Sequence, residues 1–324
     1  MTLRSRVVGI GSFLPEHVST NDDMAKIVDT SDAWIVERTG IRVRHFADEN
    51  TYTSTMAIKA AQEALAAAGM TGDDLDAIVL GTVTPDKTFP ATAVYVQAAL
   101  GMKRGFAFDV VAACSGFLYS LRTADNMIRL GQAKTVLVIG SEKVSKVTDF
   151  TDRNTCVLFG DGAGCVILKA EEEKGNASDR GVLDTLIYSD GSFAPELCST
   201  GGASTNHEVG YVTMNGREVF RHAAVNMADV SLEILEKNGL TLDDVDWLVP
   251  HQANIRIIEA TAKRLNVPMD KVITTVDRHA NTSAASIPLA LADGVKSGRL
   301  KEGQLLLLPG MGSGFTWGAS LIRL

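Results

Sequence analysis

Short apolar segments alternate with amphipathic stretches along most of the chain. Runs of consecutive apolar residues predict buried strands at 7–13, 78–80, 136–139 and 166–168. Helical spacing predicts helices at 20–27, at 33–38 between Ser31 and Gly40, and from a cap at Ser54 or Thr55 to Gly69. Strands that alternate with helices indicate an α/β fold class, in which the strands are mainly parallel and covered on both faces.

One junction between a strand and a helix carries a cysteine. Residues 106–119 read FAFDVVAACSGFLY, so the apolar strand ends by Val111, helical spacing begins at Phe117, and Cys114 lies between them. The free N–H groups and the positive dipole end of a helix stabilise an anion, and they lower the pKa of a thiol placed there. Cys114 is therefore a candidate nucleophile. Buried cysteines also serve as small apolar core residues, and this segment alone leaves both interpretations open.

The chain contains an internal repeat. Residues 60–86 align with 230–256 without a gap, at a constant offset of 170 residues. The alignment pairs Gly69 with Gly239 and Thr71 with Thr241, and it keeps three aspartates in register. Further along, the turn at 113–115 is matched to 284–286. A duplication explains this recurrence of helix, glycine stop, acidic turn and strand, and we expect two similar α/β halves, 1–172 and 173–324.

Composition and charge exclude several classes of protein. The 324 residues are 45% hydrophobic and 22% charged, which are ordinary globular values. No apolar run approaches the ~18 residues of a membrane span, and the N-terminus lacks the apolar core of a signal peptide, so we expect a cytoplasmic protein without membrane contact. The net charge of -8 argues against a nucleic-acid partner, because phosphate binding needs a basic surface. The four cysteines lack metal-ligand spacing, which predicts free thiols and no metal site.

The repeat predicts which residues meet Cys114, because equivalent strand ends of the two halves converge at their junction. The second half contributes His251 in the run LVPHQAN, Asn281 in the run RHANTSAAS, and a glycine-rich segment at 310–318. Covalent acyl transfer requires a thiol, an imidazole, a neutral carboxamide and free backbone N–H groups. Each part alone has a structural explanation: a hydrogen-bonded histidine, a helix cap at Asn281 or a tight glycine turn.

The GDGAG run at 160–164 is a separate motif. It lacks the Lys-Ser/Thr pair of a phosphate loop, and it enters a strand where a phosphate loop would enter a helix. We interpret it as a structural turn.

Six motifs carry a family resemblance. They are SDAWIVERTGIR at 31–42, AAC at 112–114, FGDGAG at 159–164, VPHQAN at 249–254, NTSAAS at 281–286 and FTWG at 315–318. In this combination the chain resembles β-ketoacyl-acyl carrier protein synthase III over essentially its whole length. The resemblance implies a thiolase-like fold of two duplicated α/β halves in an α-β-α-β-α arrangement. It also implies a cytoplasmic acyltransferase that starts bacterial type II fatty acid synthesis.

The resemblance implies a mechanism as well. Cys114 takes an acetyl group, or another short acyl group, from an acyl-CoA, and no cofactor is bound permanently. Malonyl-acyl carrier protein then loses carbon dioxide, and His251 and Asn281 stabilise the enolate that attacks the acyl-enzyme. The backbone N–H groups of Cys114 and Ser313 form the oxyanion hole.

Three positions depart from the family pattern. Met311 stands where an aromatic residue is common, Ser313 interrupts a run of glycines, and Ala280 replaces a common glycine before Asn281. A backbone N–H survives the change to serine, so we expect the oxyanion hole to be kept. Met311 is softer than an aromatic ring and changes the packing near the nucleophile.

The resemblance assigns substrate contacts to three groups of residues. Trp34 and Arg38 share a helix face, where a coenzyme A adenine would stack; without the resemblance, a core tryptophan beside a surface arginine is the simpler interpretation. The other coenzyme A contacts are Thr39, Arg153, Gly216, Phe220 and Asn254. The acyl pocket comprises Phe89, Phe159 and Met311, with Phe89 reaching into the partner of a homodimer. The residues assigned to docking of an acidic carrier protein are Arg221, Gln252, Ala253, Arg256, Lys263 and Arg264. A helix face that only meets solvent would present the same cations.

Three other functions fit parts of the sequence. The chain order Cys, His, Asn also occurs in papain-like hydrolases, but residues around Cys114 lack their Cys-Gly-Ser/Ala-Cys-Trp/Tyr context. A related thiolase-fold enzyme could condense acyl-CoA units into a secondary metabolite. A non-catalytic module that binds coenzyme A or a carrier protein is the third alternative, and the intact set of Cys114, His251 and Asn281 argues against it.

Overall fold

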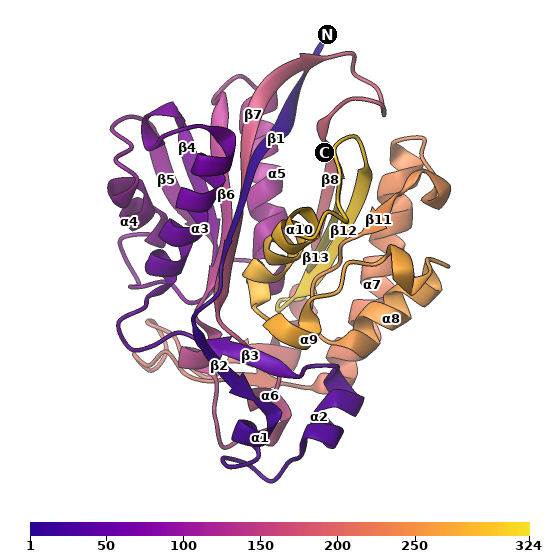
Figure 1. Ribbon diagram of the computed structural model, residues 1–324. Helices are drawn as coiled ribbons and strands as arrows, with labels where there is room; N and C mark the ends of the chain where they lie inside the picture. The colour runs from indigo at the N-terminus through magenta and orange to yellow at the C-terminus, as the bar shows by residue number, and fades with distance from the viewer.

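Nine strands form one continuous sheet in the computed structural model, which describes residues 1–324 (Figure 1). The strand order is β11-β12-β13-β8-β1-β7-β6-β4-β5. The first half of the chain supplies β1 (Thr2–Phe13), β4 (Ala77–Gly81), β5 (Phe106–Val110), β6 (Thr135–Glu142) and β7 (Gly162–Glu173). The second half supplies β8 (Gly181–Ser189), β11 (Trp247–Leu248), β12 (Leu305–Gly312) and β13 (Thr316–Arg323). A single residue pair, Ser5 with Val182, joins β1 to β8, so the sheet consists of two parts connected at one point.

Antiparallel pairing dominates the sheet, and the prediction of mainly parallel strands is wrong. Only β4–β5, β4–β6 and β11–β12 pair in parallel. Residues 313–315 alone join β12 to β13, a connection too short for the crossover that parallel strands need. The apolar runs in the sequence indicate that these strands are buried, but burial does not determine strand direction.

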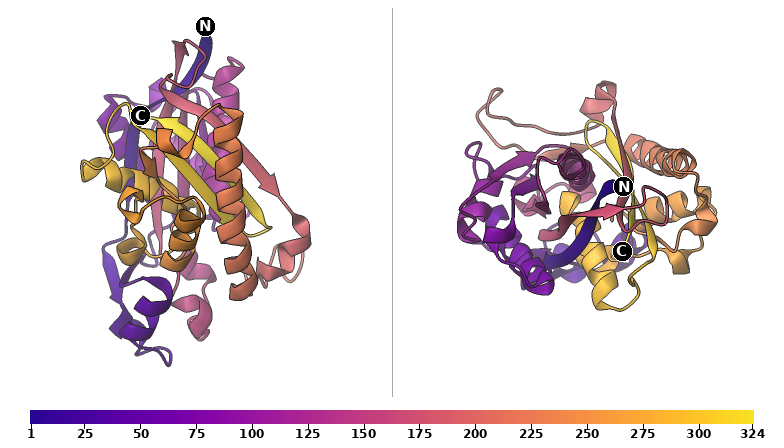
Figure 2. Two further views of the ribbon diagram at one scale, coloured as in Figure 1. Left: turned by 90° about the vertical axis from the view of Figure 1, so that its right-hand side faces the viewer. Right: turned by 90° about the horizontal axis from the view of Figure 1, so that it is seen from above.

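Helices cover both outer faces of the sheet and fill its middle (Figures 1 and 2). α3 (Thr53–Ala68) and α4 (Thr92–Ala99) pack on one outer face, whereas α7 (Gly216–Lys237) and α8 (Ile255–Arg264) pack on the other. α5 (Gly116–Arg129) and α10 (Ser286–Lys296) lie between the two parts of the sheet. The layers are therefore α-β-α-β-α.

Alternate residues of the central strands show this layering. On β6, Val136 and Val138 join the core around α5 and α10, whereas Leu137 and Ile139 join the core around α3. Because successive side chains of a strand point to opposite faces, a strand covered by helices on both sides must be apolar throughout. This explains the unbroken apolar runs in the sequence.

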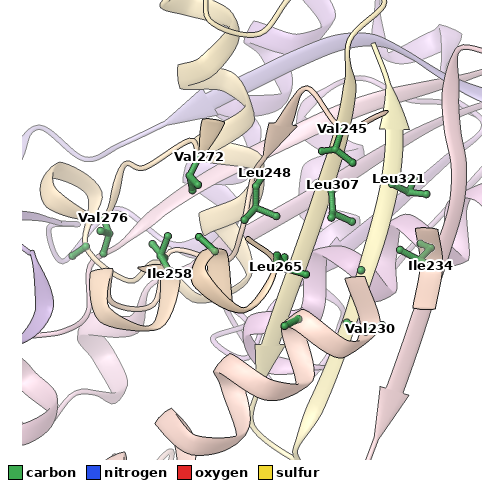
Figure 3. Close-up of a cluster of buried hydrophobic side chains, with 14 of the residues drawn as sticks. Val230, Ile234, Val245, Leu248, Ile258, Leu265, Val272, Val276, Leu307 and Leu321 are labelled. Carbon is green, nitrogen blue, oxygen red and sulfur yellow. The ribbon is translucent and has the colours of Figure 1, made fainter. Parts of the chain in front are cut away.

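The core beneath α7 and α8 holds the second part of the sheet in place (Figure 3). Val230 and Ile234 of α7 and Ile258 of α8 meet Leu307 of β12 and Leu321 of β13, and all five side chains are at most 2% exposed. Burying one such side chain contributes about 1.5–3 kcal/mol to stability. This packing holds the ends of β11 and β12 in place, and these ends border the cavity described below.

Two capped turns give the internal repeat a structural counterpart. Thr71 and Thr241 each precede a short 3₁₀ turn, Gly72–Asp74 (η1) and Leu242–Asp244 (η5). In each, the threonine N–H donates to the aspartate that ends the turn, over 2.7 and 2.8 Å respectively. The same sequence therefore builds the same turn at an offset of 170 residues. The division near residue 172, which falls at the end of β7, stays a prediction.

The turn before α5 also recurs, but one residue away from the predicted register. Ala113 has φ 47° and Ser283 has φ 51°, and they begin the 3₁₀ turns Ala113–Ser115 (η2) and Ser283–Ala285 (η7). The match of 113–115 with 284–286 is therefore wrong, and Cys114 corresponds to Ala284. Alanine and serine recur at neighbouring positions in both segments, so composition alone did not fix the register.

Helix ends lie close to their predicted positions. α2 (Asp32–Thr39) follows Ser31, whose hydroxyl accepts the Trp34 N–H, and it ends at Gly40 with φ 75°. α3 stops at Gly69 as predicted, but its N-cap is Tyr52, so the predicted cap at Ser54 or Thr55 is wrong and both residues lie inside the helix. α1 (Asn21–Met24) is shorter than the predicted 20–27. The remaining named elements are β2 (His17–Thr20), β3 (Val43–Phe46), α6 (Arg153–Cys156), β9 (Leu197–Ser199), β10 (Val212–Met214) and α9 (Val276–His279).

Two global features complete the fold. None of the helices has both the length and the apolar character needed to cross a membrane. All four cysteines are free thiols, as predicted.

Candidate active site

Cys114, His251 and Asn281 line one cavity of about 1130 Å³, whose wall is formed by both halves of the chain. Other residues named from the sequence line the same cavity: Trp34, Arg38, Thr39, Phe159, Gly216, Phe220, Ala253, Asn254, Arg256, Met311 and Ser313. Those that do not line it are Phe89, Arg153, Arg221, Gln252, Lys263 and Arg264. The structure thus gathers most of the predicted site in one place.

The backbone around Cys114 is held by β13 and by a glycine. The Thr316 hydroxyl donates to the Ala112 carbonyl over 3.0 Å, and the Ser115 hydroxyl donates to the Thr316 carbonyl over 2.9 Å. A Cβ at Gly312 would lie 2.6 Å from the Cys114 backbone nitrogen, which is closer than real Cβ contacts. Glycine at 312 therefore permits the end of β12 to lie against the nucleophile turn.

Burial keeps Cys114 in its thiol form. Desolvation raises the pKa of Cys114 to about 11, and the charge of Glu142 acts in the same direction, whereas the Ser283 hydroxyl opposes it. The expected lowering of this pKa by a helix start is wrong in direction. α5 begins only at Gly116, and removal of the charged form from water dominates. The thiol must therefore lose its proton as it reacts.

His251 enters the cavity as a neutral ring. Its backbone N–H donates to the Pro309 carbonyl over 2.9 Å, which aligns the end of β11 with β12. Its Nδ1 lies 2.6 Å from the Ser286 hydroxyl oxygen, so Nε2 is the nitrogen that remains for a ligand. Burial lowers the pKa of His251 to about 4, and the ring carries no charge at pH 7. The sequence does not predict Ser286 as the partner of His251, because the only trace of it there is a hydroxyl residue within the motif NTSAAS.

The Asn281 carboxamide has a fixed orientation. The Ser283 N–H donates to Asn281 Oδ1 over 2.9 Å. The Asn281 backbone N–H donates to the Leu158 carbonyl over 2.9 Å, and the Gly160 N–H donates to the Asn281 carbonyl over 3.1 Å. Because the side-chain oxygen is engaged by the backbone, the amide NH₂ is the group that remains to donate into the cavity.

An aromatic and cationic cluster lies at the mouth of the cavity. The guanidinium carbons of Arg38 and Arg153 lie 4.9 and 5.0 Å from the centre of the Trp34 ring, and that of Arg256 lies 5.7 Å from the Phe220 ring. Trp34 is only partly buried, so it is not the core residue of the simpler interpretation. A flat aromatic ligand and its phosphates would find both stacking surfaces and charge here.

Three further polar residues at the mouth complete this picture. Arg217, which sequence reasoning missed although it follows Gly216, is exposed and lines the cavity. The Thr39 hydroxyl donates to the Ile35 carbonyl, and the side-chain oxygen of Asn254 accepts the Arg256 N–H at the start of α8. Both side chains therefore also stabilise the local fold.

The predicted docking residues do not form one set. Arg256 and Lys263 are exposed on α8, and Arg264 lies 3.5 Å from Asp229. Gln252 is fully buried, its amide donates to the Pro250 carbonyl over 2.8 Å, and its oxygen accepts the Thr275 N–H over 2.8 Å. Its prediction as a docking residue is wrong, because these bonds commit it to the interior.

Arg221 and Ala253 also differ from a simple docking surface. Arg221 is exposed and pairs with Glu218 on its own helix. Ala253 is partly buried and faces the cavity.

The residues assigned to the acyl pocket lie in different settings. Phe159 is 6% exposed and packs with Val144 and Val147, and Met311 is 4% exposed beside Phe315. Phe89 is 80% exposed, lies on the segment between β4 and α4, and does not reach the cavity of its own chain.

Comparison with known proteins gives the family. Residues 108–191 and 235–324 match the two family models described as 3-oxoacyl-(acyl-carrier-protein) synthase III and its C-terminal part. The chain is 57% identical over 324 residues to beta-ketoacyl-(acyl-carrier-protein) synthase III of Paramagnetospirillum magneticum, and the alignment covers all of both chains.

Solved structures agree with the sequence match. The crystal structure of 3-oxoacyl-(acyl-carrier-protein) synthase III from Aquifex aeolicus superposes with a TM-score of 0.93 and 49% identity, covering 99% of this chain and 100% of that one. The priming beta-ketosynthase of the R1128 polyketide biosynthetic pathway superposes with a TM-score of 0.92 and 32% identity, covering 99% and 97%. The chain belongs to the β-ketoacyl-acyl carrier protein synthase III family of condensing acyltransferases, with a thiolase-like fold.

Proposed function

We propose that this protein condenses a short acyl-CoA, such as acetyl-CoA, with malonyl-acyl carrier protein to give 3-oxoacyl-acyl carrier protein, through an acyl-Cys114 intermediate. One observation carries the proposal: a partly buried thiol, a neutral imidazole and a carboxamide with a free NH₂ share one cavity. Neutral donors suit a reaction that generates its own carbanion, because they stabilise an enolate without needing to titrate.

In the first step the Cys114 sulfur bonds to the acyl carbon and the bond from that carbon to the coenzyme A sulfur breaks. The thiol proton leaves with the coenzyme A thiol. The oxyanion formed on the way would accept hydrogen bonds from the backbone N–H groups of Cys114 and Ser313, and one such donor is worth about a hundred- to a thousand-fold in rate.

In the second step malonyl-acyl carrier protein loses carbon dioxide, and the electron pair of the broken bond forms an enolate. His251 and the Asn281 NH₂ would donate to its oxygen. The enolate carbon then bonds to the acyl carbon as the bond from that carbon to the Cys114 sulfur breaks, and the released thiolate takes a proton from water.

The same residues argue against a hydrolase of the papain type. In that mechanism the asparagine orients the histidine. Here Nδ1 of His251 meets Ser286, and the oxygen of Asn281 is held by the Ser283 N–H, so the two side chains are oriented independently.

The proposal extends to partners. Coenzyme A would lie against Trp34, Arg38 and Arg153, and no permanently bound cofactor is part of it. A homodimer is supported by the unpaired edge strand β5 and by the exposed Phe89 near it. We place the enzyme in the cytoplasm.

Radiolabelled acetyl-CoA tests the proposal. The wild-type protein should carry label on Cys114 and form acetoacetyl-acyl carrier protein once malonyl-acyl carrier protein is added. Cys114→Ser should carry no label, whereas Asn281→Ala should keep the label and lose condensation. Release of label only as free acetate would indicate a hydrolase, and rates across acetyl-, isobutyryl- and octanoyl-CoA would separate fatty acid synthesis from a role in secondary metabolism.

A further inference from the structure

Glu142 is a buried carboxylate that the proposed reaction does not use. It ends β6 and has no exposed surface. Its oxygens accept from the Thr84 hydroxyl over 2.6 Å and from the hydroxyls of Thr82 and Ser283 over 3.0 Å each. The backbone N–H groups of Val83 and Thr84 donate over 3.1 and 3.2 Å. Every donor is neutral, so no cation balances the charge.

These hydrogen bonds connect two segments that border the cavity. One is residues 82–84, which follow β4 and lead to the exposed Phe89. The other is the turn that contains Asn281 and Ser283. Ser283 holds both groups at once, because its N–H donates to Asn281 Oδ1 and its hydroxyl donates to Glu142. The carboxylate therefore acts on the Asn281 carboxamide through one residue.

The repeat shows why a carboxylate at this position is informative. At the offset of 170 residues, Glu142 at the end of β6 corresponds to Gly312 at the end of β12. Gly312 leaves room for the turn of Cys114. Glu142, its counterpart, instead lies beside the turn of Ser283, where its carboxylate accepts a hydrogen bond from the Ser283 hydroxyl.

We propose that Glu142 is a positioning residue for condensation, which fixes the Asn281 carboxamide through Ser283. The inference rests on the proposed roles of Cys114 and Asn281. Burial raises the pKa of Glu142 to about 6, so its carboxylate is ionised at neutral pH. Its charge opposes ionisation of Cys114.

The hydrogen-bond partners of Glu142 carry no charge, and Asp86, two residues after Thr84, accepts from the Ser54 N–H over 2.9 Å. The adjacent Lys143 directs its ammonium group to the carbonyls of Asp48 and Thr51. The residues that donate from the 82–84 segment and from η7 are neutral, and His251 is uncharged at pH 7. Cys114 is a titratable group whose pKa the Glu142 charge raises, in addition to the larger effect of burial.

The experiment compares Glu142→Gln, which removes the charge, with Glu142→Asp, which keeps the charge but shortens the side chain. Iodoacetamide alkylation of Cys114 as a function of pH reports the thiol. Decarboxylation of malonyl-acyl carrier protein reports Asn281. Asp125→Asn is the matched control, because Asp125 is also fully buried and hydrogen-bonded but lies on α5 away from the cavity.

Glu142→Gln should shift the alkylation profile to lower pH by about half a unit, so that alkylation at pH 8 becomes about three-fold faster. Decarboxylation should fall about ten-fold in kcat with little change in KM. Glu142→Asp should keep the wild-type alkylation profile and lose decarboxylation. Asp125→Asn should lower thermal stability and change neither readout.

Two results would overturn the inference. One is wild-type decarboxylation in both Glu142→Gln and Glu142→Asp; the other is a decarboxylation loss in Asp125→Asn as large as in the Glu142 variants. Failure of acetyl-CoA to label wild-type Cys114 would instead refute the proposed function itself.

Discussion

His251 directs Nε2 and Asn281 directs its amide NH₂ into the cavity, because the other polar atom of each side chain is hydrogen-bonded to a serine. The Ser286 hydroxyl meets Nδ1 of His251 and also accepts the Gln252 N–H over 3.3 Å. The Ser283 N–H meets the oxygen of Asn281. A neutral imidazole has one donor and one acceptor nitrogen, so the partner of Nδ1 decides what Nε2 can do. Ser286 is therefore the residue that sets the role of His251.

Substitution of Ser286 by alanine tests this. Nδ1 of His251 and the Gln252 N–H would lose their partner, and we expect decarboxylation of malonyl-acyl carrier protein to fall about ten-fold as the ring loses its fixed orientation. Acetyl labelling of Cys114 should persist, because that step uses other donors. Ser120→Ala is the control: Ser120 is buried with an unpartnered hydroxyl, and its loss should leave both steps intact. Equal loss of labelling and decarboxylation in Ser286→Ala would contradict the assignment.

At the scale of elements, α8 connects the cavity with the outer surface. Asn254 caps its start at the cavity mouth, and Arg256 and Lys263 are exposed along it. In a chain of net charge -8, exposed cations on one helix favour an acidic partner. We therefore propose this helix, and not the buried Gln252, as the carrier-protein contact.

Reversal of two α8 charges that do not line the cavity, Lys263→Glu with Arg264→Glu, should raise KM for malonyl-acyl carrier protein by about ten-fold or more, because like charges would then face each other. Acetyl-CoA exchange should change little. Lys59→Glu with Lys301→Glu, two exposed lysines elsewhere, is the matched control and should leave both constants unchanged. Steady-state kinetics with each substrate decide the matter, and an equal loss with both substrates would show that α8 does not serve the carrier protein specifically.

The helices and strands also show which features the sequence could predict and which it could not. Ser31 and Gly40 delimited α2 because capping is local, and the repeat located His251 and Asn281 beside Cys114 because equivalent strand ends converge. Strand direction, the raised pKa of Cys114 and the interior position of Gln252 depend on packing between distant segments. No local pattern in the sequence records such packing.

The molecule as a whole should be sensitive to acid because it buries neutral histidines. Burial lowers the pKa of both His251 and His279 to about 4, against about 6.5 in an unfolded chain. The folded state therefore binds fewer protons, and their contribution to stability is present above pH 6.5 and is lost as the pH falls toward 4. Glu142, with its raised pKa of about 6, acts in the opposite sense and offsets part of this loss.

Urea denaturation at pH 7.5, 6 and 5 measures the effect. We expect the free energy of unfolding to fall with pH over this range, and His279→Gln to reduce that fall because one of the two histidines is removed. Stability that is independent of pH, or an unchanged slope in His279→Gln, would contradict the prediction.

The two matching turns at Ala113 and Ser283 have a consequence for the number of reactive centres. Ala284 occupies the place of Cys114 in the second half and is 1% exposed. A Cβ at Gly140 would lie 2.2 Å from the Ala284 carbonyl oxygen, and a Cβ at Gly116 would lie 3.1 Å from the Ala284 Cβ. The second turn is thus enclosed by backbone of the first half, and no substrate can approach it. Duplication doubled the scaffold, and close packing confined the chemistry to a single copy.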